Sequence, residues 1–400
     1  MKKQNLTLLL STAGTIALLV ATIFVVGKSE QPAPQSTAAA LGETLLPGVA
    51  EALDDVTRIQ FNTGSTDPST PATLTLEKKD GKWTLAEADS YEVKGNQVNE
   101  FLVTFRQFKP LEEKTSNPAR YSELGVQDPD GTNPDGALVI LGTEEKPELA
   151  EVIIGKQAPG LGNSRRRYVR LPEAKESWLV ESPITINTTE SYWLNTDLVD
   201  IAPAEFSSAI LTTHSGDVLS MDRPTSTSAF ITEIPEGMQI KNQRDLDNIT
   251  RTFQRLTFED VKALETSGFD SMTSETLVLA NTFGGLVLNT TLRRDDVEER
   301  WWGTIAVEHD ATLHTPGETA LDVEAATKLA EELNTKLSGW AYKLPAWKTQ
   351  NLTKEVAEFF QPIPEPEPEQ GEGQPSSQPL EKTLNLSQEE INQLLKQAQQ

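Results

Sequence analysis

The 400-residue chain contains no cysteine, only three histidines and far fewer basic than acidic residues. Without cysteine it can form no disulfide, no thiolate nucleophile and no zinc site of the cysteine type. Its 35 basic and 60 acidic residues give a net charge of −25. This charge argues against binding to nucleic acid, which needs basic surface, and against docking on anionic lipid head groups. Hydrophobic residues make up 37% of the chain, enough to predict a folded body.

Recognisable catalytic and ligand-binding motifs are equally scarce. The histidines are His214, His309 and His314, and the last two are five residues apart, which aligns them on neither a helix nor one face of a strand. The glycine-rich Gly160–Ser164 lacks the Lys-Ser/Thr of a phosphate loop and is expected to be a hairpin tip. We therefore assign no catalytic, cofactor-binding or metal-binding residue, expect no cofactor, and predict that the protein is not an enzyme.

Two charged clusters admit more than one interpretation. Arg165–Arg167 could receive an acidic partner surface, or could be a solvated strand edge that blocks aggregation. Asp295–Glu299 lacks the alternating ligands and central glycine of a calcium loop. It precedes Trp301 and Trp302, which must point to opposite faces if they lie in a strand. An exposed tryptophan at this point would suggest an interface.

An uncharged apolar stretch, Leu6–Val26, follows Lys2 and Lys3. A bilayer-spanning helix needs about 20 such residues, and the preceding lysines favour a cytoplasmic N-terminus. We therefore predict a single-pass anchor in a bacterial inner membrane, with residues 6–26 in the bilayer and the body in the periplasm. The alternative is a cleaved signal peptide, although its apolar region usually has only about 7–15 residues.

Two stretches, Tyr91–Glu112 and Met238–Asp260, repeat one apolar pattern. In each, four apolar residues have the spacing 3, 4, 3, which places them on one face of a helix. These residues are Val98, Phe101, Phe105 and Phe108 in the first stretch, and Leu246, Ile249, Phe253 and Leu256 in the second. We expect helices over Val98–Phe108, ended by Pro110, and over about Arg244–Leu256.

Strand signals surround both predicted helices in the same order. Asp80-Gly81 is typical of a tight hairpin, and Gly125 suits the end of a short helical turn that begins at Tyr121. Short apolar runs follow each helix, and Trp302–Val307 is expected to close the second sheet. The predicted fold class is α+β, with an N-terminal transmembrane helix, two repeated antiparallel-sheet-plus-helix units, C-terminal helices and a disordered tail.

The C-terminal part contains the clearest helical pattern, Leu321–Leu337, with Thr319 or Asp322 as a candidate cap. Beyond it, Ser338–Pro345 is expected to turn away and Leu352–Phe360 to form a second short helix. The composition of residues 362–383 predicts an extended disordered linker. Leu384–Gln400 is expected to be a short amphipathic helix, either a partner-docking tag or a frayed tail.

These signals divide the chain into six segments. They are residues 1–29 (cytoplasmic N-terminus and anchor), 30–52 (linker), 53–200 (first α+β unit), 201–361 (second α+β unit with C-terminal helices), 362–383 (Pro/Glu-rich linker) and 384–400 (terminal helix).

The body from about Val56 to Phe360 resembles a bacterial family of single-pass envelope proteins known only as a domain of unknown function. The residues that carry the resemblance are Val56–Phe61, Leu74–Leu85, the helix through Phe108, Tyr121–Gly125 with Asp128-Pro129, Val152–Gly155, Arg167–Arg170 and Gly339–Tyr342. Members are often encoded beside the permease and auxiliary subunits of gliding-type ABC transporters. The resemblance therefore implies membrane-protein partners, and it supplies no catalytic residues.

We expect a non-enzymatic, membrane-anchored extracytoplasmic accessory subunit of an envelope ABC-type transport complex. One alternative is a periplasmic module that binds a glycan or peptide, in a pocket lined by Trp301, Trp302 or Trp340. Another is a cell-wall hydrolase, which would need two carboxyls facing each other at about 5–9 Å.

Overall fold

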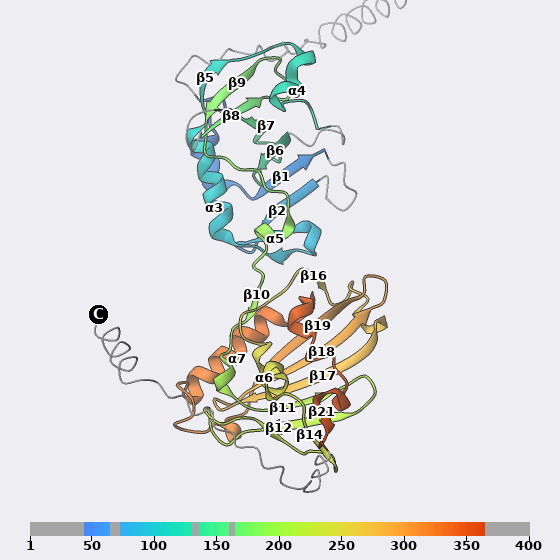
Figure 1. Cartoon of the computed structure of the whole chain (residues 1–400). Coiled ribbons are helices and arrows are strands. Elements are labelled where there is room, and N and C mark those ends of the chain that lie inside the picture. The colour runs from blue at the N-terminus through green and yellow to red at the C-terminus, as the bar shows by residue number, and fades with distance from the viewer. Residues whose placement is uncertain (1–43, 65–72, 130–135, 160–164, 365–400) are drawn as a thin grey trace, which may run out of the picture.

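The computed structural model describes residues 44–64, 73–129, 136–159 and 165–364. The predicted anchor, residues 6–26, and the predicted terminal helix, Leu384–Gln400, lie outside these ranges, as does most of the Pro/Glu-rich linker. Among the residues that are described, no helix is both long and apolar enough to cross a membrane. The described chain is a mixed, sheet-rich α+β structure whose two large sheets lie in separate lobes (Figure 1).

The first sheet has nine strands, and every neighbouring pair is antiparallel. Its spatial order is β4 (Tyr91–Glu92), β3 (Lys82–Leu85), β2 (Thr73–Lys79), β1 (Arg58–Thr63), β6 (Ala137–Gly142), β7 (Ala150–Gln157), β8 (Arg166–Arg170), β9 (Ser177–Glu181) and β5 (Lys109–Glu113). The hairpin of β2 and β3 turns at Asp80 and Gly81, both with positive φ, which confirms the predicted tight turn.

The second sheet has eight strands, also all antiparallel. Its order is β13 (Ile231–Thr232), β12 (Val218–Asp222), β11 (Phe206–Thr212), β17 (Thr273–Thr282), β18 (Leu286–Asp295), β19 (Arg300–His309), β20 (Trp340–Lys343) and β16 (Asp260–Ala263). Taken in the same spatial order, these eight strands correspond one to one to β3, β2, β1, β6, β7, β8, β9 and β5 of the first sheet. The repeated apolar pattern therefore corresponds to a repeated topology.

One helix in each lobe carries the chain from one edge of its sheet toward the other. These helices are α3 (Gly95–Val103), which follows β4 and precedes β5, and α6 (Gln243–Arg251), which precedes β16. All eight apolar residues of the repeated pattern are buried. Both helices are shorter than predicted, because η3 (Thr104–Gln107) continues α3 as a tighter turn and the chain after α6 enters β15 (Leu256–Thr257).

The remaining elements are short. The helical ones are α2 (Val49–Ala52), η1 (Leu53–Asp55), η2 (Ala86–Ala88), η4 (Pro118–Arg120), α4 (Tyr121–Leu124), α5 (Glu190–Trp193), η5 (Pro203–Glu205), η6 (Phe269–Ser271), η7 (Ala311–Leu313), α8 (Ala346–Thr349) and η8 (Val356–Phe359). Two small ladders pair β10 (Asp197–Val199) with β15, and β14 (Met238–Ile240) with β21 (Phe360–Pro362). Gly125 ends α4 with a φ of 68°, as predicted.

Three predictions about strands and helices were wrong. Pro110 does not simply end a helix but lies in β5 at a sheet edge, where its missing N–H is tolerated. The second sheet does not close at Trp302–Val307, because β20 and β16 continue it, and β20 occupies part of the segment expected to turn away. Leu352–Phe360 is not one helix, since only the 3-10 turn η8 forms there before β21.

The predicted long helix is confirmed as α7 (Val323–Leu337), inserted between β19 and β20. The carboxylate of Asp322 caps it by accepting a hydrogen bond from the backbone N–H of Ala325 at 2.8 Å. Its fully buried face is formed by Ala326, Ala330 and Leu337. The two alanines allow the helix backbone to approach the second sheet closely, as its position beside β19 illustrates (Figure 1).

The two lobes touch through the end of the first hairpin unit. The ring of Tyr91 on β4 packs edge-on against Phe258, Trp340 and Tyr342 at centroid distances of 5.3, 4.8 and 6.2 Å. The carboxylate of Asp89 accepts hydrogen bonds from Ala263 N at 2.8 Å and from the Thr266 hydroxyl at 2.9 Å. Aromatic packing and a charge-assisted contact therefore join the lobes directly.

The buried tyrosine pair at this junction predicts an alkaline loss of stability. Burial raises the pKa of both Tyr91 and Tyr342, whose ring centroids lie 6.2 Å apart. Above about pH 10 an unfolded tyrosine ionises while a folded one stays protonated, so a rise in pH stabilises only the unfolded state. Each tyrosine should therefore cost about 1.4 kcal/mol per pH unit above pH 10.

The measurement is the free energy of unfolding in urea between pH 10 and pH 11.5, for wild type and Tyr342→Phe. In Tyr342→Phe the part of the decrease in unfolding free energy per pH unit that is due to the tyrosine pair should be about half that of wild type, because only one ionisable group remains. Tyr192→Phe, at an exposed position, is the matched control and should keep the wild-type slope. Equal slopes for wild type and Tyr342→Phe would contradict the prediction.

Candidate functional site

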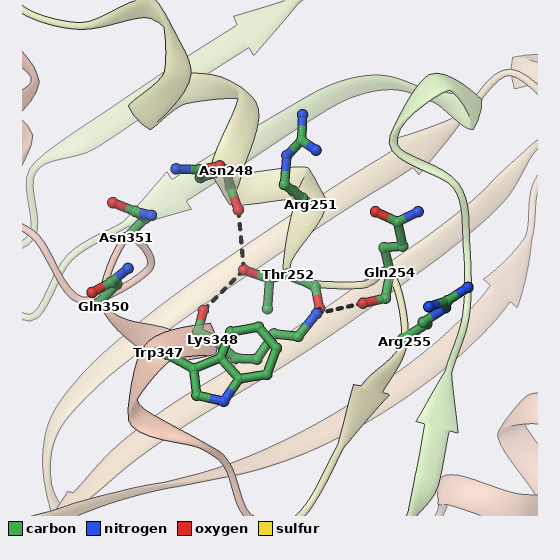
Figure 2. Close-up of a pocket in the computed structure, with 9 residues that line it drawn as sticks. All are labelled: Asn248, Arg251, Thr252, Gln254, Arg255, Trp347, Lys348, Gln350 and Asn351. Carbon is green, nitrogen blue, oxygen red and sulfur yellow. Dashed lines mark hydrogen bonds between the residues drawn. The ribbon is translucent and has the colours of Figure 1, made fainter.

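A polar cleft of about 490 Å³ opens between the end of α6 and the short helix α8, and we name it the Trp347 cleft (Figure 2). Its lining residues are Asn248, Arg251, Thr252, Gln254, Arg255, Trp347, Lys348, Gln350 and Asn351. They come from two segments almost a hundred residues apart in the chain, so the fold of the second lobe creates the cleft.

The α6 side of the cleft is shaped by the way that helix begins and ends. The side chain of Asn242 caps its first turn by accepting from the Arg244 N–H at 3.1 Å. After the helix, Arg255 adopts a left-handed backbone with a φ of 48°, and its N–H donates to the Asp200 carboxylate at 3.0 Å. This turn brings Arg251 and Arg255, four residues apart, to one rim of the cleft.

Lys348 fixes the two sides of the cleft to each other. Its side chain is only 7% exposed, and the ammonium donates to the backbone carbonyls of Thr252, at 3.1 Å, and Gln254. The hydroxyl of Thr252 in turn lies 3.0 Å from the Lys348 carbonyl oxygen (Figure 2). Burial lowers the pKa of Lys348, an effect that the charge of Asp200 opposes. The floor of the cleft is therefore preorganised.

The charge and surface character of the cleft differ from those of the whole chain. Its nine described lining residues include three cations and four side-chain amides, and none is acidic. Of the seven tryptophans, all within the described residues, Trp347 alone is exposed, at 64%. The Lys348 ammonium lies 4.8 Å from the centroid of its ring. The cations can bind the negative charge of an anion, and the exposed Trp347 ring can contact a flat apolar face of the same ligand.

The three histidines are absent from the lining of this cleft, and His214 and His309 make separate local contacts. His214 Nδ1 lies 2.8 Å from the Glu355 carboxylate, which also accepts from the Ser215 hydroxyl at 2.7 Å. His309 Nδ1 lies 2.9 Å from the Thr327 hydroxyl on α7. Throughout the ranges that the structure describes, no three His, Asp or Glu side chains are grouped as metal ligands.

The arginine cluster Arg165–Arg167 is not a strand edge. Arg166 and Arg167 lie in β8, an interior strand between β7 and β9, so the proposed role in blocking edge aggregation was wrong. Arg167 is half-buried and donates to the backbone carbonyls of Ile184 at 2.7 Å and Gly155 at 3.2 Å. The neighbouring Gly160–Ser164 lies outside the described residues.

The acidic cluster Asp295–Glu299 forms the turn between β18 and β19. The Asp295 carboxylate accepts from the backbone N–H groups of Val297 and Glu298, and Glu298 pairs with Lys343 at 2.6 Å. The following tryptophans differ in exposure, because Trp302 is fully buried and Trp301 is half-buried against the core. The cleft is therefore lined by Trp347, and not by Trp301, Trp302 or Trp340 as the binding alternative anticipated.

Sequence reasoning missed this cleft because its two walls are distant in the chain and follow no known motif. The one local signal was the pair Arg251 and Arg255, which the spacing of four would place together on a helix. In the structure the helix ends at Arg251, so the two arginines do not share a helical face. Arg255 reaches the cleft because its own backbone is left-handed.

Comparison with known proteins gives one match. No curated protein and no solved structure matches the chain. A family model described as Domain of unknown function (DUF4340) matches residues 83–272, from β3 to the end of η6. This range includes both repeated helices and the α6 side of the Trp347 cleft. Residues 83–272 thus carry the pattern of the DUF4340 domain, in agreement with the resemblance to a family of unknown function.

Proposed function

We propose that the protein is a non-enzymatic accessory subunit of an envelope ABC-type transport complex, anchored in a bacterial inner membrane by residues 6–26 with its body in the periplasm. The observation that carries the proposal is the duplicated body. Two lobes that share the order of eight strands meet through Tyr91 and Asp89, an arrangement that presents a long surface to partners. The family resemblance suggests transporter subunits as those partners.

The use of buried charge also supports a structural body. Arg170 in the first lobe donates to four backbone carbonyls. Arg223 in the second lobe donates to the carbonyls of Phe206, at 2.7 Å, and Pro203, and lies 4.4 Å from the Phe230 ring centroid. Both guanidinium groups, buried at Arg170 and half-buried at Arg223, stabilise the loops whose carbonyls they engage.

The test is affinity purification of the full chain from mild detergent after in-cell crosslinking. We expect to recover the permease or auxiliary subunits of a transporter together with the protein. A second sample should end at Pro364, which keeps β21 paired with β14. Loss of the subunits from this sample would place docking in residues 365–400, which include the predicted terminal helix Leu384–Gln400. Recovery of nothing beyond the protein itself from the full chain would refute the accessory role.

A second candidate function is ligand binding in the periplasm. The Trp347 cleft favours it, because a preorganised floor, convergent polar groups and an exposed aromatic ring are typical of small-ligand sites. The two functions are compatible, since an accessory subunit can also bind a ligand.

A further inference from the structure

We infer that the Trp347 cleft binds an acidic saccharide, a sugar chain whose units carry carboxylates. The charge of the cleft supports an anionic ligand. The exposed Arg251 and Arg255 line it without an acidic residue among the lining residues, in a chain whose net charge is −25. Guanidinium groups bind carboxylates through paired N–H donors.

The four amide side chains favour a ligand rich in hydroxyl groups. Asn248, Gln254, Gln350 and Asn351 each offer both donors and acceptors. A sugar hydroxyl also both donates and accepts, so it can use both functions of an amide. An acidic peptide also carries backbone donors and acceptors that can pair with these amides, so the contact of the sugar face with Trp347 and the comparison ligands below separate the two ligand classes.

The exposed ring of Trp347 provides the apolar contact that a sugar needs. The Lys348 ammonium lies over the ring, 4.8 Å from its centroid, yet 64% of the residue remains exposed. A pyranose ring has a flat face of C–H groups that packs well on such a surface. The cleft volume of about 490 Å³ lies within the range of small-ligand sites.

The test is calorimetric titration of the full chain in detergent at low salt with tri-galacturonate. Neutral maltotriose and tri-glutamate are the comparison ligands. We expect tri-galacturonate to bind at least about tenfold more tightly than either, and its affinity to fall as salt is added. Equal binding of maltotriose, equal or tighter binding of tri-glutamate, or no binding of tri-galacturonate would each overturn the inference.

Variants then place the binding in the cleft. Trp347→Ala and the double variant Arg251→Gln/Arg255→Gln should each weaken tri-galacturonate binding by about tenfold or more, as is typical for central contacts. Arg244→Gln removes one positive charge from the exposed start of the same helix, outside the cleft, and should retain wild-type affinity. Wild-type affinity in both cleft variants would overturn the inference. Neither result depends on transporter subunits, so this inference and the accessory role fail separately.

Discussion

Arg170→Ala is expected to destabilise the protein by about 3–5 kcal/mol, the cost typical of removing a buried, fully bonded charge. Arg170 is only 3% exposed. Its guanidinium donates to the carbonyls of Val126, Leu171, Pro172 and Ala174 at 2.9–3.3 Å and to the Asp128 carboxylate at 2.7 Å.

The physical reason lies in how many groups depend on this one side chain. The guanidinium also covers the Tyr121 ring, 4.7 Å from its centroid, and so holds α4 against β8. Alanine would leave several carbonyls without a donor and open a cavity over the ring, and each unpaired buried group costs about 1–3 kcal/mol. Arg170→Lys should restore only part of the loss, because an ammonium cannot reproduce the planar fork.

The measurement is the urea midpoint and slope of unfolding for the full chain in detergent. Arg166→Ala is the matched control, since Arg166 lies in the same strand with an exposed side chain. It should change the free energy of unfolding by no more than about 0.5 kcal/mol. A difference between the two variants below about 1 kcal/mol would mean that the bonds of Arg170 contribute little net stability.

Local patterns predicted the elements that depend on neighbours in the chain. The eight apolar residues of the repeat, the Asp80-Gly81 turn, the Gly125 helix end and the Asp322 cap all arise from contacts within a few residues. Such contacts leave a periodic or positional signature. The α+β class and the repeated order of the two units could therefore be argued before the structure was known.

The elements that were missed depend on partners far along the chain. β5 pairs with β9, so that Lys109 lies opposite Glu181. The residues around Pro110 have no pattern that predicts a strand. β16 likewise pairs with β20 across the inserted helix α7. The role of Arg170 is hidden for the same reason, because its acceptors lie on both sides of it, including Val126, 44 residues earlier. Non-local pairing carries almost no local signal.

The Trp347 cleft is the clearest example of a feature that depends on contacts between distant parts of the chain. Its rim residues, Arg251 and Arg255, are ordinary in sequence, and Trp347 stands alone after Pro345 with no pattern around it. The two walls are joined by the Lys348 ammonium, bound to carbonyls 94 and 96 residues away, and by the Thr252 hydroxyl, which donates to the Lys348 carbonyl. A site assembled in this way is found from the fold and not from a motif.

Tyr91→Ala is expected to convert a single thermal unfolding transition into two. Truncation of a buried aromatic costs about 3–5 kcal/mol, and here the lost contacts are those with Phe258, Trp340 and Tyr342 of the other lobe. The measurement is differential scanning calorimetry of the full chain.

The split is expected because the coupling between the lobes depends on few contacts. With the Tyr91 ring removed, the Asp89 carboxylate, which accepts from Ala263 and Thr266, is the main polar link across the junction, and exposed bonds of this kind are weak. Each lobe has its own sheet and helix and can then unfold at its own temperature. Tyr91→Phe keeps the ring and loses only the hydroxyl, so it should retain one transition. A single transition in Tyr91→Ala would mean that the lobes are held together by contacts other than this aromatic cluster, and the long two-lobe surface on which the accessory role depends would then need another explanation.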